Sequence, residues 1–407
     1  MSIRVGLLAG SPVPFKIPLY RRISDAADID LTVIYASDLG VRAIGPELAG
    51  YGIAFRWDTD LLAGYRSTFL RGASRNNGYG VSFTQMVDPD IVPLLARKRF
   101  DVLWLEGYSS VTHLLAVAAQ RALGGALIMR EEQTLLHPRS LMKTIVKEVV
   151  MRSFFAQLDA AVYVSRENRR WLEHYGIPPQ HLFSSPYAPD TDRFSAEAER
   201  LRPGRDALRR EFGFAPDAGP VVLSSSRLVE NKQPEMVLEA FRRVRRRRPC
   251  ALLVVGSGPA EPELRATVER ERIPDVRFAG FLNQSELPRV YAAADIFMLL
   301  SKRGETFGMA VAEAMHFGLA LVLSDKVGSA ADLLGDGGNG FLVHRDDPEG
   351  AASALERLVA DDALRERFGE SSRERVRDWS LERATAGALE AIRFAAQRTR
   401  EGSPSPP

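Results

Sequence analysis

The sequence has one cysteine, no long apolar run and almost no excess of either charge. Cys250 is the only cysteine among 407 residues, which excludes an internal disulfide and is typical of a reducing compartment. No apolar stretch approaches the roughly 20 residues that a membrane-spanning helix needs. Lys and Arg number 54 and Asp and Glu 52, so the net charge of +2 gives no reason to expect a nucleic-acid partner. We therefore expect a cytoplasmic protein, or one bound peripherally at the inner face of a membrane.

Metal-binding patterns are also lacking, because the 6 histidines and the single cysteine have no ligand spacing. What is present is a composition of 45% hydrophobic and 26% charged residues, which is typical of a globular protein. At about 150 residues per domain, the length predicts two or three domains. The last seven residues, 401–407, are Gly, Ser and Pro rich, and we predict a disordered tail there.

Short apolar runs alternate with segments of helical periodicity. Several runs are apolar at consecutive positions, which is typical of strands buried on both faces of a parallel sheet. The expected strands of the first series are Ile3–Ala9, Leu31–Tyr35, Asp101–Leu105, Ala126–Met129 and Ala160–Val164. Those of the second series are Val221–Ser225, Ala251–Val255, Val276–Gly280, Ile296–Leu300 and Ala320–Ser324. Two such series predict an α/β protein with two doubly wound, Rossmann-like domains.

The boundary between the series is the charged, Gly- and Pro-containing segment Ala196–Pro220. We expect an N-terminal domain over 1–195 and a C-terminal domain over 205–378, followed by a helix over about 379–398. The segment Gly40–Gly80 lacks periodicity, and a long excursion of this kind is usually functional.

Residues 301–318 enter a predicted helix, from about Gly308 to His316, directly after a predicted strand. Doubly wound proteins bind ligands at this kind of junction, and a helix N-terminus suits phosphate. Glu313 is the one acid among apolar residues of the helix. It lies either on a solvent-facing strip or in a buried position, where it needs hydrogen-bond donors such as ribose hydroxyls.

Two further strand ends carry residues suited to a nucleotide. Arg227 and Lys232 follow Val221–Ser225, and a guanidinium with an ammonium suits a diphosphate, although two solvated surface cations are the commoner case. Gly256 and Gly258 follow Ala251–Val255. The main chain near Phe281 and Leu282, after Val276–Gly280, is placed to meet a flat base.

Taken in order, S-R-L-x-x-x-K, V-V-G-S-G-P, F-x-G-F and E-T-F-G-M-A-V-A-E resemble the C-terminal half of the retaining GT-B glycosyltransferases, family 4 in particular. Glu305 and Glu313 match the E-x7-E motif of that family, and the resemblance spans about Val221–Val343. The resemblance implies two Rossmann-like domains facing a cleft, with a C-terminal helix that crosses back to the first domain.

The resemblance also implies roles for individual residues. Arg227 and Lys232 would bind the donor diphosphate, Glu305 hydroxyls of the transferred sugar, and Glu313 the ribose. The remaining donor-side residues that it implies are Gly10, Gly256, Gly258, Phe281, Leu282, Phe307 and Gly308.

Upstream, the resemblance is weaker. The family often has a histidine after the fourth strand of the first domain, where this chain has Arg130, Glu131 and Glu132. The acceptor-side candidates are Glu106, Tyr108, Arg130 and Glu131, while His113 is interpreted as a helix-face residue. Because the donor motifs all follow Val221, we expect the first domain and the Gly40–Gly80 excursion to select the acceptor. The side chains of the excursion that suit sugars or anionic carriers are Tyr51, Trp57, Tyr65, Arg66, Phe69 and Arg71.

The implied activity is transfer of a sugar, with retention of configuration, from a nucleotide diphosphate sugar to a carbohydrate or lipid-linked acceptor in polysaccharide, glycolipid or glycoconjugate biosynthesis. Two alternatives stay open: an epimerase or phosphorylase on the same fold, and a catalytically silent nucleotide-sugar-binding subunit. Asp58–Asp60 and Asp190–Asp192 have the DxD spacing that binds metal in another glycosyltransferase fold. We interpret them as loop acids and expect neither a metal nor another cofactor.

Two charged segments allow a functional and a structural interpretation. Arg242–Arg248 contains six arginines in seven positions, and Leu141–Leu158 is amphipathic with Lys143, Lys147 and Arg152. Either segment is suited to contact an anionic membrane surface. A solvated helix end and a core-facing helix are the commoner explanations, and we favour these.

Overall fold

The computed structural model describes residues 2–46, 51–75, 83–84, 86–136, 141–303 and 305–400. The chain divides into two compact units. The first contains residues 1–44, 59–187 and 381–407, and the second contains residues 45–58 and 188–380. Gly304 and the predicted tail 401–407 lie outside the described residues.

The first unit is built on a seven-stranded parallel sheet in the order β3-β2-β1-β4-β5-β6-β7. Its strands are β1 (Ile3–Ala9), β2 (Ile29–Tyr35), β3 (Ser67–Phe69), β4 (Val102–Glu106), β5 (Ala126–Arg130), β6 (Ala160–Tyr163) and β7 (Leu182–Ser184). Consecutive apolar residues of β1, β4 and β5 are buried, as expected for strands covered on both faces. The point at which the strand order reverses, between β1 and β4, is where such sheets form ligand sites.

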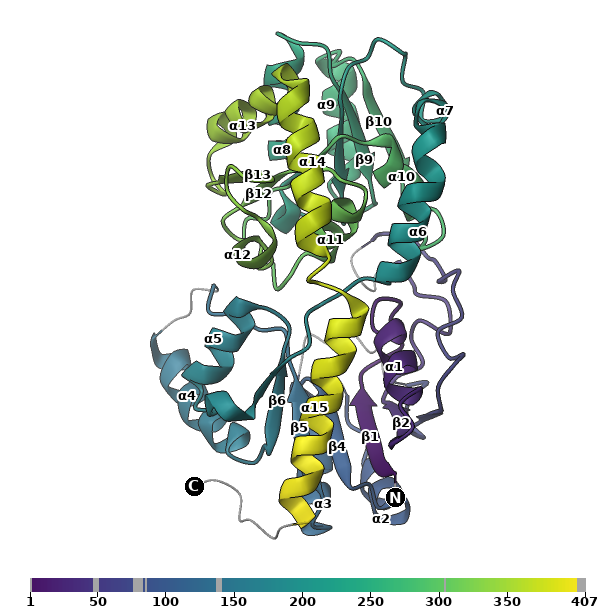
Figure 1. Ribbon diagram of the computed structural model, residues 1–407, viewed down its shortest axis with the longest axis vertical. Coiled ribbons are helices and arrows are strands. Elements are labelled where there is room, and N and C mark those ends of the chain that lie inside the picture. The colour runs from purple at the N-terminus through teal and green to yellow at the C-terminus, as the bar shows by residue number, and fades with distance from the viewer. Residues whose placement is uncertain are drawn as a thin grey trace. The chain divides into compact units, whose positions relative to one another are not determined.

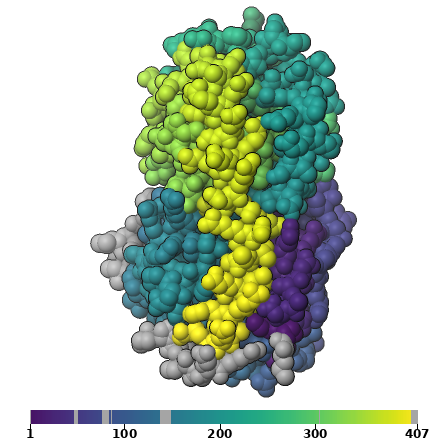
Figure 2. Space-filling model, viewed as in Figure 1, coloured from purple at the N-terminus to yellow at the C-terminus, as the bar shows by residue number. Residues whose placement is uncertain are grey.

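Helices surround this sheet: α1 (Ile17–Ser24), α2 (Ile91–Lys98), α3 (Val111–Ala122), α4 (Leu141–Phe155), α5 (Arg166–His174) and α15 (Leu381–Arg400). The last of these follows the whole second unit in the sequence, yet it packs on α1, β5, β6 and β7 (Figure 1). It approaches the sheet closely because small residues, among them Ala384, Ala388 and Ala391, line its buried side. In Figure 2 its outer side forms a continuous yellow band on this unit.

The second unit has a six-stranded parallel sheet in the order β10-β9-β8-β11-β12-β13. Its strands are β8 (Val221–Ser225), β9 (Ala251–Val255), β10 (Val276–Gly280), β11 (Ile296–Leu299), β12 (Ala320–Ser324) and β13 (Gly340–Val343). Its helices are α6 (Thr191–Leu201), α7 (Arg205–Glu211), α8 (Pro234–Arg245), α9 (Glu261–Arg270), α10 (Leu287–Ala293), α11 (Met309–His316), α12 (Ala330–Leu333), α13 (Pro348–Ala360) and α14 (Asp362–Val376).

The two parallel, doubly wound sheets confirm the predicted fold class. Each predicted strand is present within two residues of its expected ends. The strands β3, β7 and β13 were not predicted, because the first two have only three residues and β13 is an edge strand whose Leu342 is exposed. Short 3-10 helices, at Pro179–His181, Arg202–Gly204 and Glu230–Lys232, were not predicted either.

The boundary between the units lies at Tyr187–Ala188, before the composition break. The segment Ala196–Pro220 lies within the second unit, where it forms the end of α6 and all of α7. The carboxylate of Asp295 accepts hydrogen bonds from Arg205 (2.6 Å) and from Arg209. Charges that are typical of a solvated linker therefore attach α7 to the body of the unit. In the described parts of the chain, no helix is both long and apolar enough to cross a membrane.

Candidate functional site

The loops that follow β8, β9, β10 and β11 enclose a cavity of about 290 Å³ in the second unit. Of the predicted donor-side residues, Arg227, Lys232, Gly256, Phe281, Leu282, Glu305, Gly308 and Glu313 line it. These residues come from four separate segments, and the parallel sheet brings them together because its strands all end at the same edge. The arrangement joins cations, carboxylates and aromatic rings in one concave site.

Lys232 and Glu305 are direct partners in this cavity. The ammonium of Lys232 donates a hydrogen bond to the Glu305 carboxylate, and Ser301 Oγ donates to the same oxygen at 3.2 Å. Both side chains are largely buried, with exposed fractions of 12% and 16%. Sequence analysis selected both residues but did not pair them.

The main chain holds this ion pair in place. The amide of Lys302 donates to the Asn231 carbonyl at 2.9 Å, and the amide of Arg303 donates to the Asn231 side chain at 2.9 Å. These bonds join the loop after β8 to the loop after β11. Glu305 is attached in turn to the loop after β12, because its amide donates to the Lys326 carbonyl at 2.8 Å.

Burial lowers the pKa of Lys232 to about 7, and the nearby charge of Arg227 acts in the same direction. The contact with the Glu305 carboxylate acts in the opposite direction, since it favours the ammonium form. A dianionic ligand would add to that effect and raise the pKa further. The site therefore binds anions best while Lys232 is protonated.

Glu313 is buried, with an exposed fraction of 9%, so the structure selects the buried alternative for this acid. The hydroxyl of Tyr291 on α10 donates to Glu313 Oε2 at 2.6 Å. Burial raises the pKa of Glu313, while the hydrogen bond from Tyr291 acts against that rise. Tyr291 also lines the cavity, and no sequence motif indicated it, because the contact joins two helices that are separate in the sequence.

Two glycines of the loop after β9 allow that loop to pack closely against the loop after β8. Gly256 has φ +119, and a Cβ there would lie 2.0 Å from the Ser226 carbonyl oxygen. A Cβ on Gly258 would lie 2.4 Å from the Leu228 carbonyl oxygen. Both glycines therefore let this loop approach the loop that carries Arg227, and Gly256 in addition lines the cavity.

Three predicted donor-side residues lie outside the wall of the cavity, namely Gly258, Phe307 and Gly10. Phe307 is buried and its ring packs on Trp379, with centroids 5.5 Å apart. Gly10 follows β1 in the first unit. The expectation that each supports the donor stays a prediction.

Tyr51 and Trp57 also line this cavity, although sequence analysis assigned them to acceptor recognition. They belong to residues 45–58, which pack with the second unit. The rest of the excursion packs with the first unit, where the hydroxyls of Tyr65 and Tyr35 are 2.6 Å apart. The guanidinium of Arg66 pairs with Asp30 at 3.0 Å. The excursion is therefore divided between the two units, and its role in acceptor recognition stays a prediction.

In the first unit, Glu106 and Arg130 end the adjacent strands β4 and β5 and are register partners. Lys16, which the sequence analysis missed, donates to Glu106 Oε2 at 2.7 Å and lies 3.7 Å from Glu132. The guanidinium of Arg130 is 3% exposed and lies over the Tyr187 ring, 4.6 Å from its centroid. Two buried cations thus share one sheet edge with several acids.

Glu131 and Glu132 complete this cluster. Burial raises the pKa of Glu131 to about 7, and the neighbouring Glu132 adds to the rise. The Tyr187 hydroxyl donates to Glu132 Oε1. Tyr187 therefore binds a carboxylate of the candidate acceptor edge.

Tyr108 packs among aromatic rings, whereas His113 lies at the start of α3 and within reach of the Glu106 main chain. The ring of Tyr108 stacks on Trp171, with centroids 6.2 Å apart, and packs against Phe154 at 5.8 Å. His113 Nδ1 is 2.7 Å from the hydroxyl of Ser110, which caps α3. Burial lowers the pKa of His113 to about 4, so this residue is a neutral part of the helix start.

The acidic triplets have structural partners. Asp58 accepts a hydrogen bond from the amide of Ser285 at 3.0 Å, and Asp190 caps α6. Asp60 Oδ1 accepts from the amide of Leu62 at 3.0 Å. Among the residues that the structure describes, no group of three or more His, Cys, Asp or Glu side chains could hold a metal ion.

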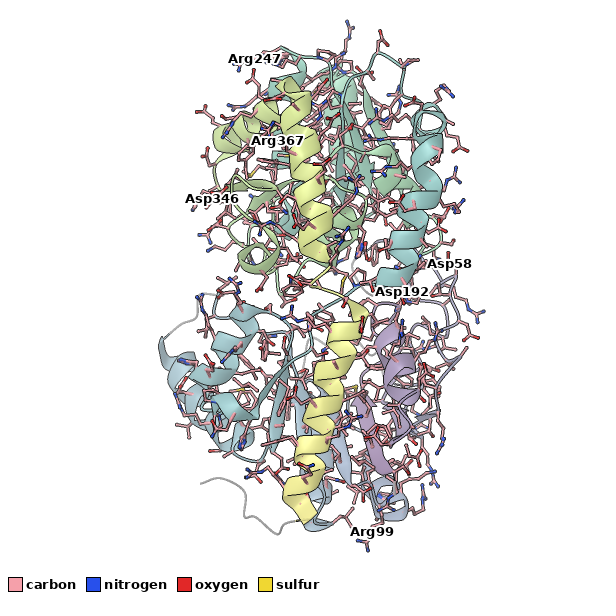
Figure 3. All side chains as sticks on the ribbon, in the orientation of Figure 1. Asp58, Arg99, Asp192, Arg247, Asp346 and Arg367 are labelled. Atoms are coloured by element: carbon pink, nitrogen blue, oxygen red, sulfur yellow. The ribbon has the colours of Figure 1, made fainter. Side chains whose placement is uncertain are left out.

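The arginine run is also paired, although Arg247 lies at the surface of the second unit (Figure 3). Arg247 binds Glu356 at 3.0 Å, and Arg245 binds Asp275 at 2.7 Å. In α4, the side chains of 141–147, including Lys143 and Lys147, lie outside the described residues.

The second unit also has a larger cavity, of about 420 Å³. It is lined by four arginines and four acids, among them the pairs Arg205–Asp295 and Arg365–Asp362.

Comparison with known proteins finds similarity to one family over the second unit. Residues 206–375 match the family profile of the glycosyl transferases group 1. The chain is 32% identical over 170 residues to the alpha-D-kanosaminyltransferase of Streptomyces kanamyceticus, covering 41% of this chain and 43% of the relative. It is 30% identical over 246 residues to a GDP-mannose-dependent alpha-(1-6)-phosphatidylinositol monomannoside mannosyltransferase of Mycolicibacterium smegmatis, covering 58% and 61%. The chain thus spans about half the length of these relatives.

The crystal structure of Anabaena Alr3699/HepE in complex with UDP and glucose superposes with a TM-score of 0.70 at 16% identity, covering 96% of this chain and 99% of that one. At this identity the likeness establishes the fold. Together with the two parallel sheets, it confirms the GT-B fold that the motifs implied.

Proposed function

We propose that the chain is a retaining hexosyltransferase, because its residues 206–375 match the family profile of the glycosyl transferases group 1. It moves a sugar from a nucleotide diphosphate sugar to an acceptor hydroxyl. The observation that carries the proposal is the cavity in which Arg227 and Lys232 meet the two acids Glu305 and Glu313. Cations for a diphosphate and carboxylates for hydroxyls are the two kinds of group that such a donor requires.

In this proposal Arg227 and Lys232 bind the diphosphate. Glu313, oriented by Tyr291, accepts hydrogen bonds from the ribose, and Glu305 accepts them from the transferred sugar. Donor binding then replaces part of the Lys232–Glu305 ion pair, because the ammonium turns to the phosphate while the carboxylate turns to the sugar. The amides near Gly308, where α11 begins, support the phosphate and the sugar.

The transfer breaks the bond between the anomeric carbon and the diphosphate oxygen, and the electron pair leaves with the phosphate. The acceptor oxygen forms the new bond on the same face, and its proton moves to the departing phosphate oxygen. Negative charge grows on the leaving group during this step. Positioned cations at that oxygen therefore stabilise the transition state more than the ground state.

We propose that the acceptor binds to the first unit, at the edge that carries Glu106, Arg130 and Glu131. Three acids with two cations at this edge suit an acceptor that presents several hydroxyl groups. The names of the relatives, a kanosaminyltransferase and a phosphatidylinositol monomannoside mannosyltransferase, support a sugar or lipid-linked acceptor in glycolipid or glycoconjugate biosynthesis.

The test is a thermal-shift screen over nucleotide sugars, followed by a turnover assay with the donor that stabilises the protein most. A ligand at 100 times its dissociation constant stabilises the folded state by about 2.7 kcal/mol. We expect release of the nucleoside diphosphate to accelerate when a suitable acceptor is added. Product analysis should find the anomeric configuration retained.

Three other results would contradict the proposal. Interconversion of the donor sugar without release of nucleotide would indicate an epimerase. Consumption of phosphate with formation of a sugar phosphate would indicate a phosphorylase. A thermal shift without turnover for any acceptor would indicate a silent nucleotide-sugar-binding subunit.

A further inference from the structure

Residues 51–58, called the strap below, lie on the second unit although they come early in the chain. They contact two of the loops that form the donor cavity. The hydroxyl of Ser257, in the loop after β9, donates to the Tyr51 carbonyl at 2.7 Å. The side chain of Asn283, in the loop after β10, donates to the Arg56 carbonyl at 2.6 Å. Asp58 accepts from the amide of Ser285, as described above.

These anchors engage main-chain carbonyl oxygens at Tyr51 and Arg56, so they place no demand on the side chains of Tyr51 and Trp57. The aromatic side chains have a different arrangement. Phe55 is buried, with an exposed fraction of 9%, and its ring centroid is 4.4 Å from that of Phe281. It also contacts the rings of Tyr51 (5.2 Å) and Trp57 (5.0 Å).

Phe55 does not line the cavity, whereas its three aromatic neighbours do. Phe55 is thus the support behind a wall made of Tyr51, Trp57 and Phe281. Such a wall offers ring faces and edges to a ligand, and every nucleotide base has a π-face that packs on them.

Trp57 provides a polar group in that wall. Its indole Nε1 is buried and has no hydrogen-bond partner among the residues that the structure describes. The indole N–H is only a donor, and leaving a buried donor unpaired is unfavourable. An acceptor atom on a ligand in the cavity would satisfy it.

The position of the wall along the sheet identifies the part of the ligand. Phe281 follows the edge strand β10, the glycine loop follows β9, and Arg227 and Lys232 follow β8. Neighbouring strands are about 4.8 Å apart, so roughly 10 Å separates the ends of β10 and β8. In a nucleoside diphosphate, the base and the diphosphate lie at opposite ends of the ribose.

We propose that the strap is the base-recognition wall of the donor site. The base packs on Tyr51 and Phe281, and the indole N–H of Trp57 donates to an acceptor atom of the base. This inference rests on the proposed function. It adds residues from the first half of the chain to a site whose motifs all follow Val221, and it assigns to donor recognition a segment that the sequence assigned to the acceptor.

The experiment is calorimetric titration of the full-length protein and its variants with UDP, GDP, ADP and inorganic pyrophosphate. Pyrophosphate has the diphosphate but no base. With the nucleotide that binds the wild type most tightly, Trp57→Ala should weaken affinity by about 10-fold or more. Trp57→Phe keeps a ring without the N–H, and it should weaken affinity by a smaller factor. Neither variant should change the affinity for pyrophosphate.

Tyr65→Phe is the matched control, because this tyrosine belongs to the same excursion but packs with the first unit. It should leave both affinities unchanged. Unchanged nucleotide affinity in a folded Trp57→Ala variant would overturn the proposal, as would an equal loss for pyrophosphate. If the wild type bound none of the nucleotides, the proposed function itself would fall.

Discussion

At the scale of single residues, the ion pair between Lys232 and Glu305 is the most consequential contact in the donor cavity. It holds a cation and an anion ready in one place, and it keeps both charges stable in a partly buried site. An isolated buried ammonium would tend to lose its proton, as the lowered pKa of Lys232 indicates. The pair therefore explains how a lysine so enclosed stays available for a diphosphate.

Lys232→Ala should lower turnover by about 10²-fold or more, on the scale of losing one donor that stabilises transition-state charge. The fold should remain intact, as judged by the melting temperature. Steady-state kinetics against Lys302→Ala gives the comparison, because Lys302 lies in a neighbouring loop, is more exposed and pairs with Glu230. Near-native turnover of Lys232→Ala would remove the diphosphate assignment.

Substitution of Glu313 and of Glu305 should weaken the binding of different ligands. Glu313 is assigned to the ribose, so Glu313→Gln should weaken binding of the free nucleoside diphosphate as well as the donor. Glu305→Gln should weaken only donor binding. It also leaves the Lys232 ammonium without its carboxylate partner, so affinity for the free diphosphate should stay the same or rise. Titration calorimetry with the nucleotide alone distinguishes the two, and equal losses would contradict the division of roles.

Glu131 predicts a pH dependence of stability. Its pKa rises from 4.5 to about 7 on folding, so the folded state binds the proton more tightly than the unfolded state. The resulting stabilisation is complete below pH 4.5 and is lost as the pH rises to about 7. Glu131→Gln should therefore gain in melting temperature relative to the wild type across this range. Glu173→Gln, at a solvent-facing Arg169 pair, is the control, and parallel curves for wild type and Glu131→Gln would refute the assignment.

At the scale of elements, α15 packs so closely on the sheet of the first unit that a larger residue at Gly387 has no space. A Cβ on Gly387 would lie 1.8 Å from the Ser184 carbonyl oxygen at the end of β7. Helix propensity alone favours alanine over glycine by about 1 kcal/mol. Here the packing of helix on strand opposes propensity, and the clash involves the main chain of β7, which cannot rotate away.

Gly387→Ala should therefore destabilise the protein, by about 1–3 kcal/mol for an overpacked contact. Ala386→Gly, at the neighbouring exposed position, should cost only the propensity difference of about 1 kcal/mol. Denaturant unfolding of both variants measures the two effects. A stabilised Gly387→Ala variant would show that the close approach of α15 to β7 is absent in solution.

At the scale of the whole molecule, the chain distributes its chemistry over two units. The cations and acids of the donor cavity lie in the second unit, and the cluster around Glu106 and Arg130 lies in the first. In the proposed function, Arg227 and Lys232 provide the positive charge that a divalent metal can otherwise provide, so catalysis should not need a metal.

Activity should accordingly survive treatment with EDTA, with less than a two-fold change in initial rate. The assay is the same turnover measurement, before and after chelation and dialysis. Loss of activity that Mn²⁺ or Mg²⁺ restores would contradict the expectation. The triplets Asp58–Asp60 and Asp190–Asp192 would then need to be tested as metal ligands.

The sequence by itself determined the fold class, ten of the thirteen described strands and the charged residues that meet in the cavity of the second unit. Apolar runs mark strands that are buried on both faces, and strand ends of a parallel sheet meet at one edge. Arg227, Lys232, Glu305 and Glu313 were therefore predictable from two local motifs. Each of these inferences depends only on neighbouring residues and on the geometry that all such sheets share.

Only the tertiary structure decided the contacts between segments that are distant in the sequence. Three examples have no local sequence signal: Tyr291 beside Glu313, Lys16 beside Glu106, and Trp57 in the donor cavity. The residues on either side of a side chain do not indicate which distant residue it contacts. The excursion illustrates the reason. Its aromatic residues suggested a functional segment, yet hydrogen bonds to the main chain at Tyr51 and Arg56 place part of it on the second unit, and a main-chain carbonyl can accept such a bond in any sequence.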